Sequence, residues 1–118
     1  MPNAPLVLVV EDDYDVRVVI AKFLEEQGYR LAVANERSTG AEIMRATHPA
    51  LLIADVRLRG GNGNDLAKLA GAMDIPVLLI SGEPVAIEQH GDNATFLQKP
   101  FRLAALEEKI KELIGSLG

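Results

Sequence analysis

The sequence predicts an α/β domain built on a doubly wound, five-stranded parallel sheet. Short aliphatic runs alternate along the chain with segments whose apolar residues have helical spacing. The runs are apolar at consecutive positions, which is typical of strands buried on both faces of a parallel sheet. A length of 118 residues suits a single domain, which we expect to occupy residues 1–118.

The first predicted strand is Leu6–Val10, a continuous aliphatic run. The helix after it is indicated by apolar residues one helical turn apart, which we expect to form its buried face. These residues are Val16, Val19, Ile20, Phe23 and Leu24. Gly28 is placed to end this helix, because glycine readily adopts the backbone conformation of a helix terminus.

The second strand is predicted at Leu31–Ala34 and the third at Leu51–Ala54. Between them, a helix runs from Ser38 to about Thr47. It must end before Pro49, since the residue preceding a proline avoids helical backbone angles.

The glycine-rich stretch Arg59–Gly63 reads as a loop, and Asn64 is a candidate cap for the next helix. The apolar residues that predict this helix are Leu66, Leu69, Ala70 and Met73. A fourth strand follows at Val77–Ile80.

The C-terminal third is predicted to contain a short helix, a fifth strand and a last helix. The polar segment Glu83–Asn93 leaves room for roughly two or three helical turns, and Thr95–Gln98 reads as the strand. In the last helix, Glu107 and Glu108 are spaced to pair with Lys111. Its apolar stripe, which we assign to the core, consists of Leu103, Leu106, Ile110 and Leu113.

If such a (βα)5 sheet has the flavodoxin-like strand order 2-1-3-4-5, ligands are expected at the carboxyl ends of its strands, near the point where the direction of the connections reverses. Polar residues follow four of the five predicted strands and should meet at that edge. They are Glu11, Asp12, Asp13, Asp55, Ser81 and Lys99. Taken alone, the Glu11–Asp13 run also suits the N-terminus of a helix, where carboxylates cap free amides.

Clustered carboxylates repel one another unless a cation or proton is present. Carboxylate oxygens favour a hard cation, and Mg²⁺ suits a site that leaves positions for water and a phosphate. Asp55 could then act as a nucleophile toward phosphorus. The Lys99 ammonium and the Ser81 hydroxyl could hold the phosphoryl oxygens.

Four segments carry a family resemblance in their order and spacing. They are Leu8–Asp13, Ile53–Asp55, Leu79–Gly82 and Phe96–Phe101. In these segments the chain resembles the receiver domains of response regulators in two-component signalling, and the resemblance covers the whole chain.

The resemblance implies an acidic metal site. Glu11 and Asp12 correspond to the metal-binding pair, and Asp55 to the phosphoacceptor and a further ligand. The backbone carbonyl of Arg57 corresponds to another ligand. The implied cofactor is Mg²⁺, with Mn²⁺ as an alternative.

The resemblance also implies a switch. Ser81 corresponds to the hydroxyl that senses the phosphoryl group, Lys99 to its partner cation, and Phe96 to the aromatic residue whose rotamer reports phosphorylation. It further implies a cis Lys99–Pro100 peptide bond.

The sequence departs from the common receiver pattern at four points. Arg59 stands where proline is usual, Gly82 replaces alanine, and Phe96 lacks a tyrosine hydroxyl. The interval from Ser81 to Lys99 is about one helical turn shorter than usual. This shortening resembles an atypical receiver subgroup known mainly from alphaproteobacteria, with a short or irregular fourth helix.

Composition narrows the partners and the compartment. The net charge of −5 and pI near 5.0 argue against direct nucleic-acid or membrane binding. The chain has no cysteine, no apolar run long enough for a membrane span and no signal-peptide pattern, so we expect the cytoplasm. The resemblance to receiver domains implies two kinds of protein partner: a sensor histidine kinase or histidine phosphotransfer protein, and a downstream target. The expected state is a monomer or weak dimer.

Two other functions remain open at this level. A receiver-like docking module would never be phosphorylated, although it would not require the full set of polar residues. A metal-dependent phosphohydrolase could also use Asp55, but it would need an acid/base aspartate where Arg57 stands. We therefore expect no enzyme activity beyond the domain's own phosphorylation and slow dephosphorylation.

Overall fold

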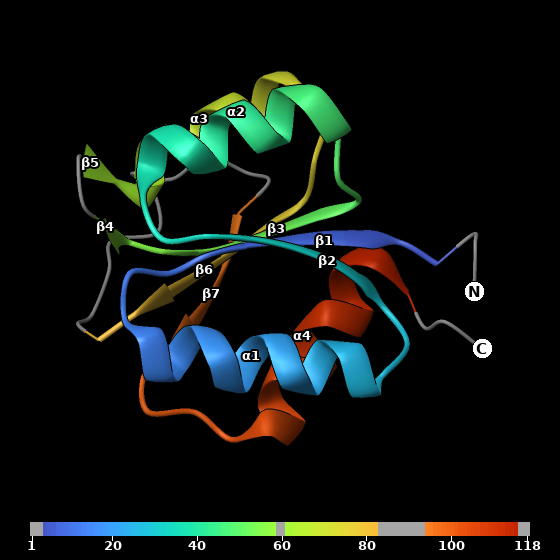
Figure 1. The fold of residues 1–118 in the computed structure, drawn as a ribbon. Coiled ribbons are helices and arrows are strands. Elements are labelled where there is room, and N and C mark those ends of the chain that lie inside the picture. Colours follow the sequence, from blue (N-terminus) through green and yellow to red (C-terminus); the bar gives the residue numbers. More distant parts are fainter. Residues whose placement is uncertain (1–3, 59–60, 83–93, 116–118) are drawn as a thin grey trace.

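The protein folds as a three-layer sandwich with a five-stranded parallel sheet in the middle (Figure 1). The computed structural model describes residues 4–58, 61–82 and 94–115. The sheet has the order β2-β1-β3-β6-β7. Its strands are β1 (Leu6–Val10), β2 (Arg30–Ala34), β3 (Leu51–Asp55), β6 (Val77–Ser81) and β7 (Ala94–Gln98). Counted along the chain, this is the predicted order 2-1-3-4-5, so the fold class is confirmed.

Helices cover both faces of the sheet: α2 and α3 lie on one face, α1 and α4 on the other (Figure 1). Their bounds are α1 (Tyr14–Glu26), α2 (Arg37–Thr47), α3 (Gly63–Ala72) and α4 (Leu103–Ile114). The short helix predicted in Glu83–Asn93 lies outside the described residues. Within the described ranges, no helix combines the length and apolar character needed to cross a membrane.

The strands alternate their side chains between two separate apolar cores. On one face, Leu8, Leu52 and Leu79 pack with residues of α2 and α3. On the other, Val9, Ile53 and Ile80 pack with α1 and α4. Because all five residues of both β3 and β6 are buried, the two central strands hold the sheet between these cores.

Two residues assigned to the core from helical spacing are exposed instead. Val19 on α1 is 51% exposed and Leu103 at the start of α4 is 39% exposed. The buried residues of α1 are Ile20 and Leu24, and those of α4 are Leu106 and Ile110. The predicted apolar face was therefore too wide, because each helix touches the sheet along a narrow line and its flanking residues face outward.

The predicted loop after Asp55 contains a small antiparallel hairpin. Strand β4 (Arg57–Leu58) pairs with β5 (Gly61–Asn62), and α3 begins directly afterwards at Gly63. The cap of α3 is Asn62 rather than the predicted Asn64: the Asn62 Oδ1 atom accepts a hydrogen bond from the Asn64 amide, 2.8 Å away. The prediction was wrong because the helix begins at Gly63, a residue that was predicted to lie in the preceding glycine-rich loop.

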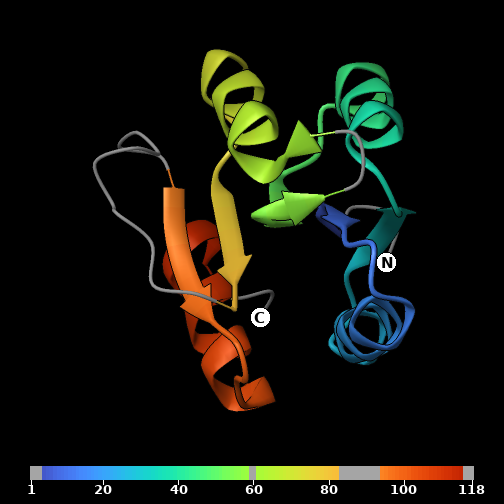
Figure 2. The same ribbon diagram turned by 90° about the vertical axis from the view of Figure 1, so that its left-hand side faces the viewer.

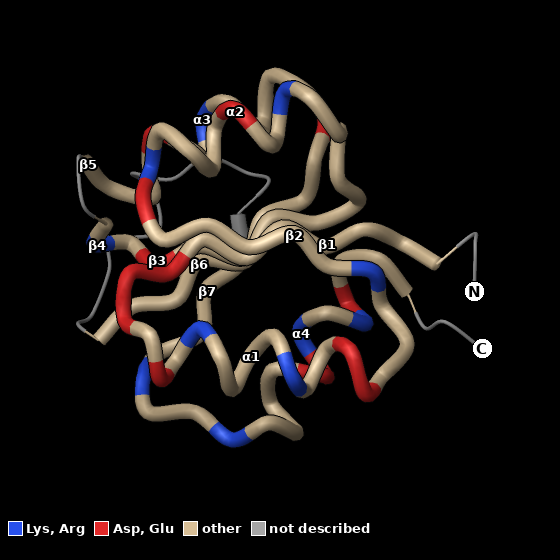
Figure 3. The backbone as a smooth tube through the Cα atoms, in the orientation of Figure 1, with Lys and Arg blue, Asp and Glu red and all other residues tan. Residues whose placement is uncertain are grey.

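The carboxyl ends of the parallel strands form one edge of the molecule, which Figure 2 views from in front. Asp55 and Ser81 are the last residues of β3 and β6. Each was expected directly after its strand, so both strands are one residue longer than predicted. At the same edge, acidic residues follow β1 directly (Figure 3). The edge at which the sequence predicts a site is therefore acidic.

Candidate functional site

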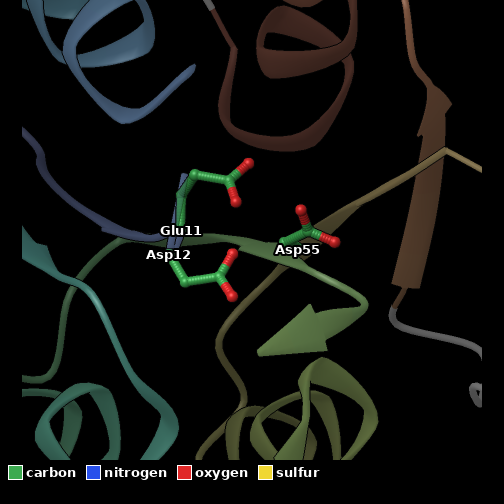
Figure 4. A group of neighbouring side chains, drawn as sticks. All are labelled: Glu11, Asp12 and Asp55. Atoms are coloured by element: carbon green, nitrogen blue, oxygen red, sulfur yellow. The ribbon is translucent and has the colours of Figure 1, made fainter. Parts of the chain in front are cut away.

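Three carboxylates converge at this edge: Glu11 and Asp12 after β1, and Asp55 at the end of β3 (Figure 4). One carboxylate oxygen of each lies within 4.8 Å of those of the other two. Glu11 is 1% exposed and Asp55 is 8% exposed, whereas Asp12 faces solvent. The cluster is therefore buried on the side of Glu11 and Asp55 and open to solvent on the side of Asp12.

Lys99, which directly follows β7, reaches into this cluster. Its Nζ atom donates hydrogen bonds to Asp55 Oδ2 at 2.6 Å and to Glu11 Oε1 at 2.9 Å. The backbone of Lys99 is fixed at the end of the sheet, since its amide donates to the Ser81 carbonyl at 2.7 Å. The Lys99 ammonium thus binds two carboxylates that are distant in sequence, Glu11 (88 positions away) and Asp55 (44 positions away).

The other carboxylate oxygens accept backbone hydrogen bonds. Asp55 Oδ1 accepts from the Arg57 amide at 2.9 Å, and Glu11 Oε2 accepts from the Asp13 amide at 3.3 Å. Asp13 itself caps α1, because its Oδ1 accepts from the amides of Asp15 and Val16. The acidic run therefore has two roles: Glu11 and Asp12 belong to the cluster, and Asp13 is the helix cap.

The proximity of these groups changes their protonation. Burial raises the pKa of Glu11 from 4.5 to about 7; the hydrogen bond from Lys99 opposes this shift and the Asp55 carboxylate adds to it. Burial lowers the pKa of Lys99, but the hydrogen bonds and charges of Asp55 and Glu11 outweigh it, so the pKa lies above 10.5. Lys99 is accordingly charged at neutral pH, while the pKa of the Glu11 carboxyl is raised toward neutrality.

The donor set fits a hard divalent cation. Two of the three carboxylates, Glu11 and Asp55, bind the Lys99 ammonium, and oxygens of all three are close enough to share one ion. The exposed Asp12 leaves an open side on which water and a phosphate could complete an octahedral shell. Oxygen ligands of this kind suit Mg²⁺ or Mn²⁺ better than a softer metal.

The backbone around Asp55 is tightly packed. The Gly63 amide donates to the Val56 carbonyl at 2.8 Å, which closes the hairpin against the end of β3. A Cβ atom at position 63 would overlap the carbonyl group of Asp55. Glycine is required there because the start of α3 approaches the strand so closely.

Comparison with known proteins agrees with the fold. The profile of the response regulator receiver domain matches residues 7–111. The chain belongs to this family.

Among curated relatives, the receiver domain resembles the response regulator receiver protein CpdR of Brucella abortus. The two are 29% identical over 114 residues, which are 92% of this chain and 95% of CpdR. It is also 26% identical to the transcriptional regulatory protein AfsQ1 of Streptomyces coelicolor, over 93% of this chain. The chain spans about half of AfsQ1 (51%) and 23% of the regulator DctD of Rhizobium meliloti.

Solved structures agree with these relatives. The receiver domain of the hybrid histidine kinase CckA superposes with a TM-score of 0.80 at 32% identity, covering 92% of this chain and 98% of that one. A CheY-like receiver domain from Methanospirillum hungatei superposes with a TM-score of 0.86, covering 95% and 94%. At 23% identity, the second likeness concerns the fold alone.

The remaining residues singled out from the sequence lie on β6, β7 and β4 and directly after β7. Ser81 is buried at the end of β6, beside β3. Phe96 on β7 is half-buried and packs against the core on the side of α2 and α3. Arg57 lies in β4, two residues after Asp55, and the Lys99–Pro100 peptide bond is cis.

One contact at the receiver site was missed from the sequence. The Arg17 Nη1 atom donates to the Glu11 carbonyl at 2.8 Å, and its guanidinium carbon lies 5.5 Å from the centre of the Tyr14 ring. Arg17 lies one helical turn after Asp13, so periodicity places it near the start of α1. Only the fold shows that it reaches back to the strand end that carries Glu11.

An apolar groove of about 460 Å³ adjoins the site between α1 and the start of α4. The exposed Val19 and Leu103 line this groove. Both have the spacing of core residues, but their side chains face the groove and do not pack in the core. Lys99 borders both the groove and the acidic cluster. The other apolar lining residues include Val16, Ile20, Pro100 and Phe101.

Proposed function

We propose that residues 1–118 form one receiver domain in which Asp55 accepts a phosphoryl group from a phosphohistidine donor. The observation that carries this proposal is the surroundings of the Asp55 carboxylate, which binds the Lys99 ammonium and lies close to the carboxylates of Glu11 and Asp12 at the carboxyl edge of the sheet. Family membership supports the same reading.

In the proposed step, one carboxylate oxygen of Asp55 forms a bond to phosphorus as the phosphorus–nitrogen bond of the donor breaks. The electron pair of that bond leaves with the imidazole of the donor histidine. Asp55 is oriented for attack because the Arg57 amide and Lys99 each hold one of its oxygens. Phosphoryl transfer depends mainly on such positioning and on neutralising charge.

Glu11, Asp12, Asp55 and the Arg57 carbonyl would hold Mg²⁺ or Mn²⁺. When bound, the ion supplies positive charge that offsets the phosphoryl oxygens. Lys99 would then exchange its ion pair with Asp55 for one with the new phosphoryl group. Because Glu11 also binds Lys99, this lysine moves little when it changes partner.

Ser81 and Phe96 are proposed to convert phosphorylation into a change of surface. A phosphoryl group on Asp55 would draw the Ser81 hydroxyl toward it, and the space released would admit the Phe96 ring. The domain would thus shift its population toward a state that a downstream protein binds. Catalysis would be limited to the domain's own phosphorylation and slow dephosphorylation.

The donor is proposed to be a histidine kinase or histidine phosphotransfer protein that places the helix carrying its histidine along the groove. The groove is continuous with the site, because Lys99 borders both the groove and the phosphoacceptor. A helix seated against Val19 and Leu103 would therefore end next to Asp55. An apolar helix face would also cover these two exposed side chains.

The proposal is tested by intact-mass analysis after incubation with acetyl phosphate and Mg²⁺. We expect one phosphoryl adduct in the wild type and none in Asp55→Asn or without metal. No adduct together with no Mg²⁺ binding would favour the constitutive docking module, whereas repeated turnover of phosphoesters would favour a phosphohydrolase.

A second arm of the same experiment examines the donor. Val19→Glu should slow transfer from a phosphorylated histidine protein far more than labelling by acetyl phosphate, because only the protein donor uses the groove. Equal effects on both reactions would reject the groove as the donor surface.

A further inference from the structure

We infer that Arg37 is a positioning residue for the metal site, acting through the hairpin that follows Asp55. Its side chain links the start of α2 to β5 and to the first turn of α3, and so fixes the segment that carries Arg57. This inference deepens the proposed function and rests on it for the identity of the bound ion.

The first observation is an ion pair between two helices. Arg37 is the first residue of α2, and its Nη1 atom lies 3.2 Å from Oδ2 of Asp65 in the first turn of α3. The two residues are 28 positions apart in the chain. Their side chains are 40% and 51% exposed, so the pair contributes little to global stability. Its effect should therefore be local.

The second observation is the close contact of Arg37 with the hairpin. A Cβ atom at Gly61 would overlap Nε and Cδ of Arg37, so the arginine side chain covers this glycine directly. Gly61 has a φ of 154°, which residues with a side chain seldom adopt. Glycine at position 61 thus serves both the backbone conformation and the approach of the arginine.

The hairpin transmits this contact to the phosphoacceptor. In the β4–β5 ladder, Gly61 pairs with Leu58 and Asn62 pairs with Arg57. The Arg57 amide donates to Asp55 Oδ1 at 2.9 Å, and the Gly63 amide donates to the Val56 carbonyl at 2.8 Å. If β5 moved away from α2, Arg57 would move with it, and with Arg57 the backbone carbonyl proposed as a metal ligand.

An arginine suits this position better than a lysine. Its planar guanidinium can lie flat over the Gly61 backbone while its terminal nitrogen binds the Asp65 carboxylate. A lysine could keep the ion pair but would cover less of the hairpin. The arrangement therefore predicts that Arg37→Lys is intermediate between the wild type and Arg37→Ala.

The test compares Arg37→Ala with Lys111→Ala. Lys111 forms a similarly exposed ion pair with Glu107 at 2.7 Å on α4, away from the hairpin. Two quantities are measured: amide hydrogen exchange at Arg57 and Gly63 in the metal-free protein, and the Mg²⁺ dissociation constant from calorimetric titration. A third variant, Asp65→Asn, removes the anchor while keeping Arg37.

In Arg37→Ala we expect several-fold faster exchange at both amides and Mg²⁺ binding weaker by about twofold to fivefold, as expected for a loosened exposed contact. Lys111→Ala should change neither. The double variant Arg37→Ala/Asp65→Asn should be no worse than Arg37→Ala alone, because both residues act through one contact.

Unchanged exchange at Arg57 and Gly63 in a folded Arg37→Ala protein would overturn the inference, as would an equal loss of Mg²⁺ affinity in Lys111→Ala. Faster exchange with unchanged Mg²⁺ affinity would also reject it, because the hairpin would then move without affecting the ion. A wild type that binds no Mg²⁺ would contradict the proposed function instead, and the exchange data would still show whether Arg37 holds the hairpin.

Discussion

At the scale of single residues, Glu11 shows how the site stores electrostatic free energy. Its carboxylate is almost fully buried and lies beside Asp55, with Lys99 as a shared partner. Burial of a charge is costly unless the charge is paired, and here one ammonium serves two carboxylates. The metal-free protein therefore holds a carboxyl group whose ionised form is disfavoured.

This shift predicts that the metal-free protein becomes more stable as the pH falls from about 8 to 5. The pKa of Glu11 is about 7 in the folded protein and 4.5 ordinarily, so between these values the folded state binds more protons than the unfolded state. Stability then decreases as the pH rises toward 7 and levels off above it. The expected difference is about 1–3 kcal/mol, measured by urea unfolding at each pH.

The matched variant for this prediction is Glu11→Gln, which cannot ionise. It should flatten the pH dependence of the unfolding free energy between pH 5 and pH 8. A dependence as steep as that of the wild type would assign the effect to another group.

Single residues also show what could be inferred from sequence. Glu11, Asp55 and Lys99 were predicted to meet because each follows a strand, and the carboxyl ends of parallel strands share one edge. Arg17 and Arg37 were not assigned to the site. Their contacts with the Glu11 carbonyl and with Gly61 depend on how the connections between strands and helices are folded, and no residue spacing encodes this.

At the scale of the elements, the strands were predicted more closely than the helix faces. The buried strands β3 and β6 are aliphatic at nearly every position, so their existence and limits are clear from composition. In the helices, Val19 and Leu103 have the spacing of core residues yet lie along the groove. Periodicity identifies an apolar side of a helix, but it does not say how much of that side the sheet covers.

Two neighbouring aspartates before α1 have different roles, and their substitution should affect stability and metal binding differently. Asp13 caps the helix through the amides of Asp15 and Val16, whereas Asp12 belongs to the acidic cluster. Asp13→Ala should therefore lower the unfolding free energy by about 1 kcal/mol with little change in Mg²⁺ affinity. Asp12→Asn should do the reverse. Thermal unfolding and calorimetric titration of both variants check this.

Asp13→Asn provides the control for the cap, because asparagine accepts the same hydrogen bonds without the charge. It should retain most of the stability lost in Asp13→Ala. If Asp13→Ala instead abolished Mg²⁺ binding, Asp13 would have to be counted among the ligands.

At the scale of the whole molecule, the two apolar cores fix the sheet so firmly that the acidic edge cannot relax by spreading apart. The central strands are buried throughout and paired on both sides. The carboxylates that follow β1 and that of Asp55 at the end of β3 therefore stay close together even though they repel one another. A cation that binds between them acts on the stability of the entire fold.

Mg²⁺ should accordingly stabilise the wild-type protein against unfolding. At a free concentration ten times its dissociation constant, the expected gain is about 1.4 kcal/mol, because the ion binds the folded state alone. Urea unfolding with and without Mg²⁺ measures this gain, with an equal ionic strength of NaCl as the control. Asp12→Asn should show a smaller gain at the same Mg²⁺ concentration, and equal stabilisation by NaCl would mean that the effect is general screening.

The fold class and the residues at the carboxyl edge followed from the sequence, because hydrophobic periodicity and the geometry of parallel sheets depend on local patterns that repeat along the chain. The strand order 2-1-3-4-5 was assumed for a fold of this class, and the structure confirms it. The tertiary structure alone decided that Asp13 caps a helix while Asp12 joins the cluster, that Val19 faces a groove, and that Arg37 lies over Gly61. These features depend on distances between residues far apart in the chain. Such distances are set by how two cores pack against one sheet, and no single segment contains that information.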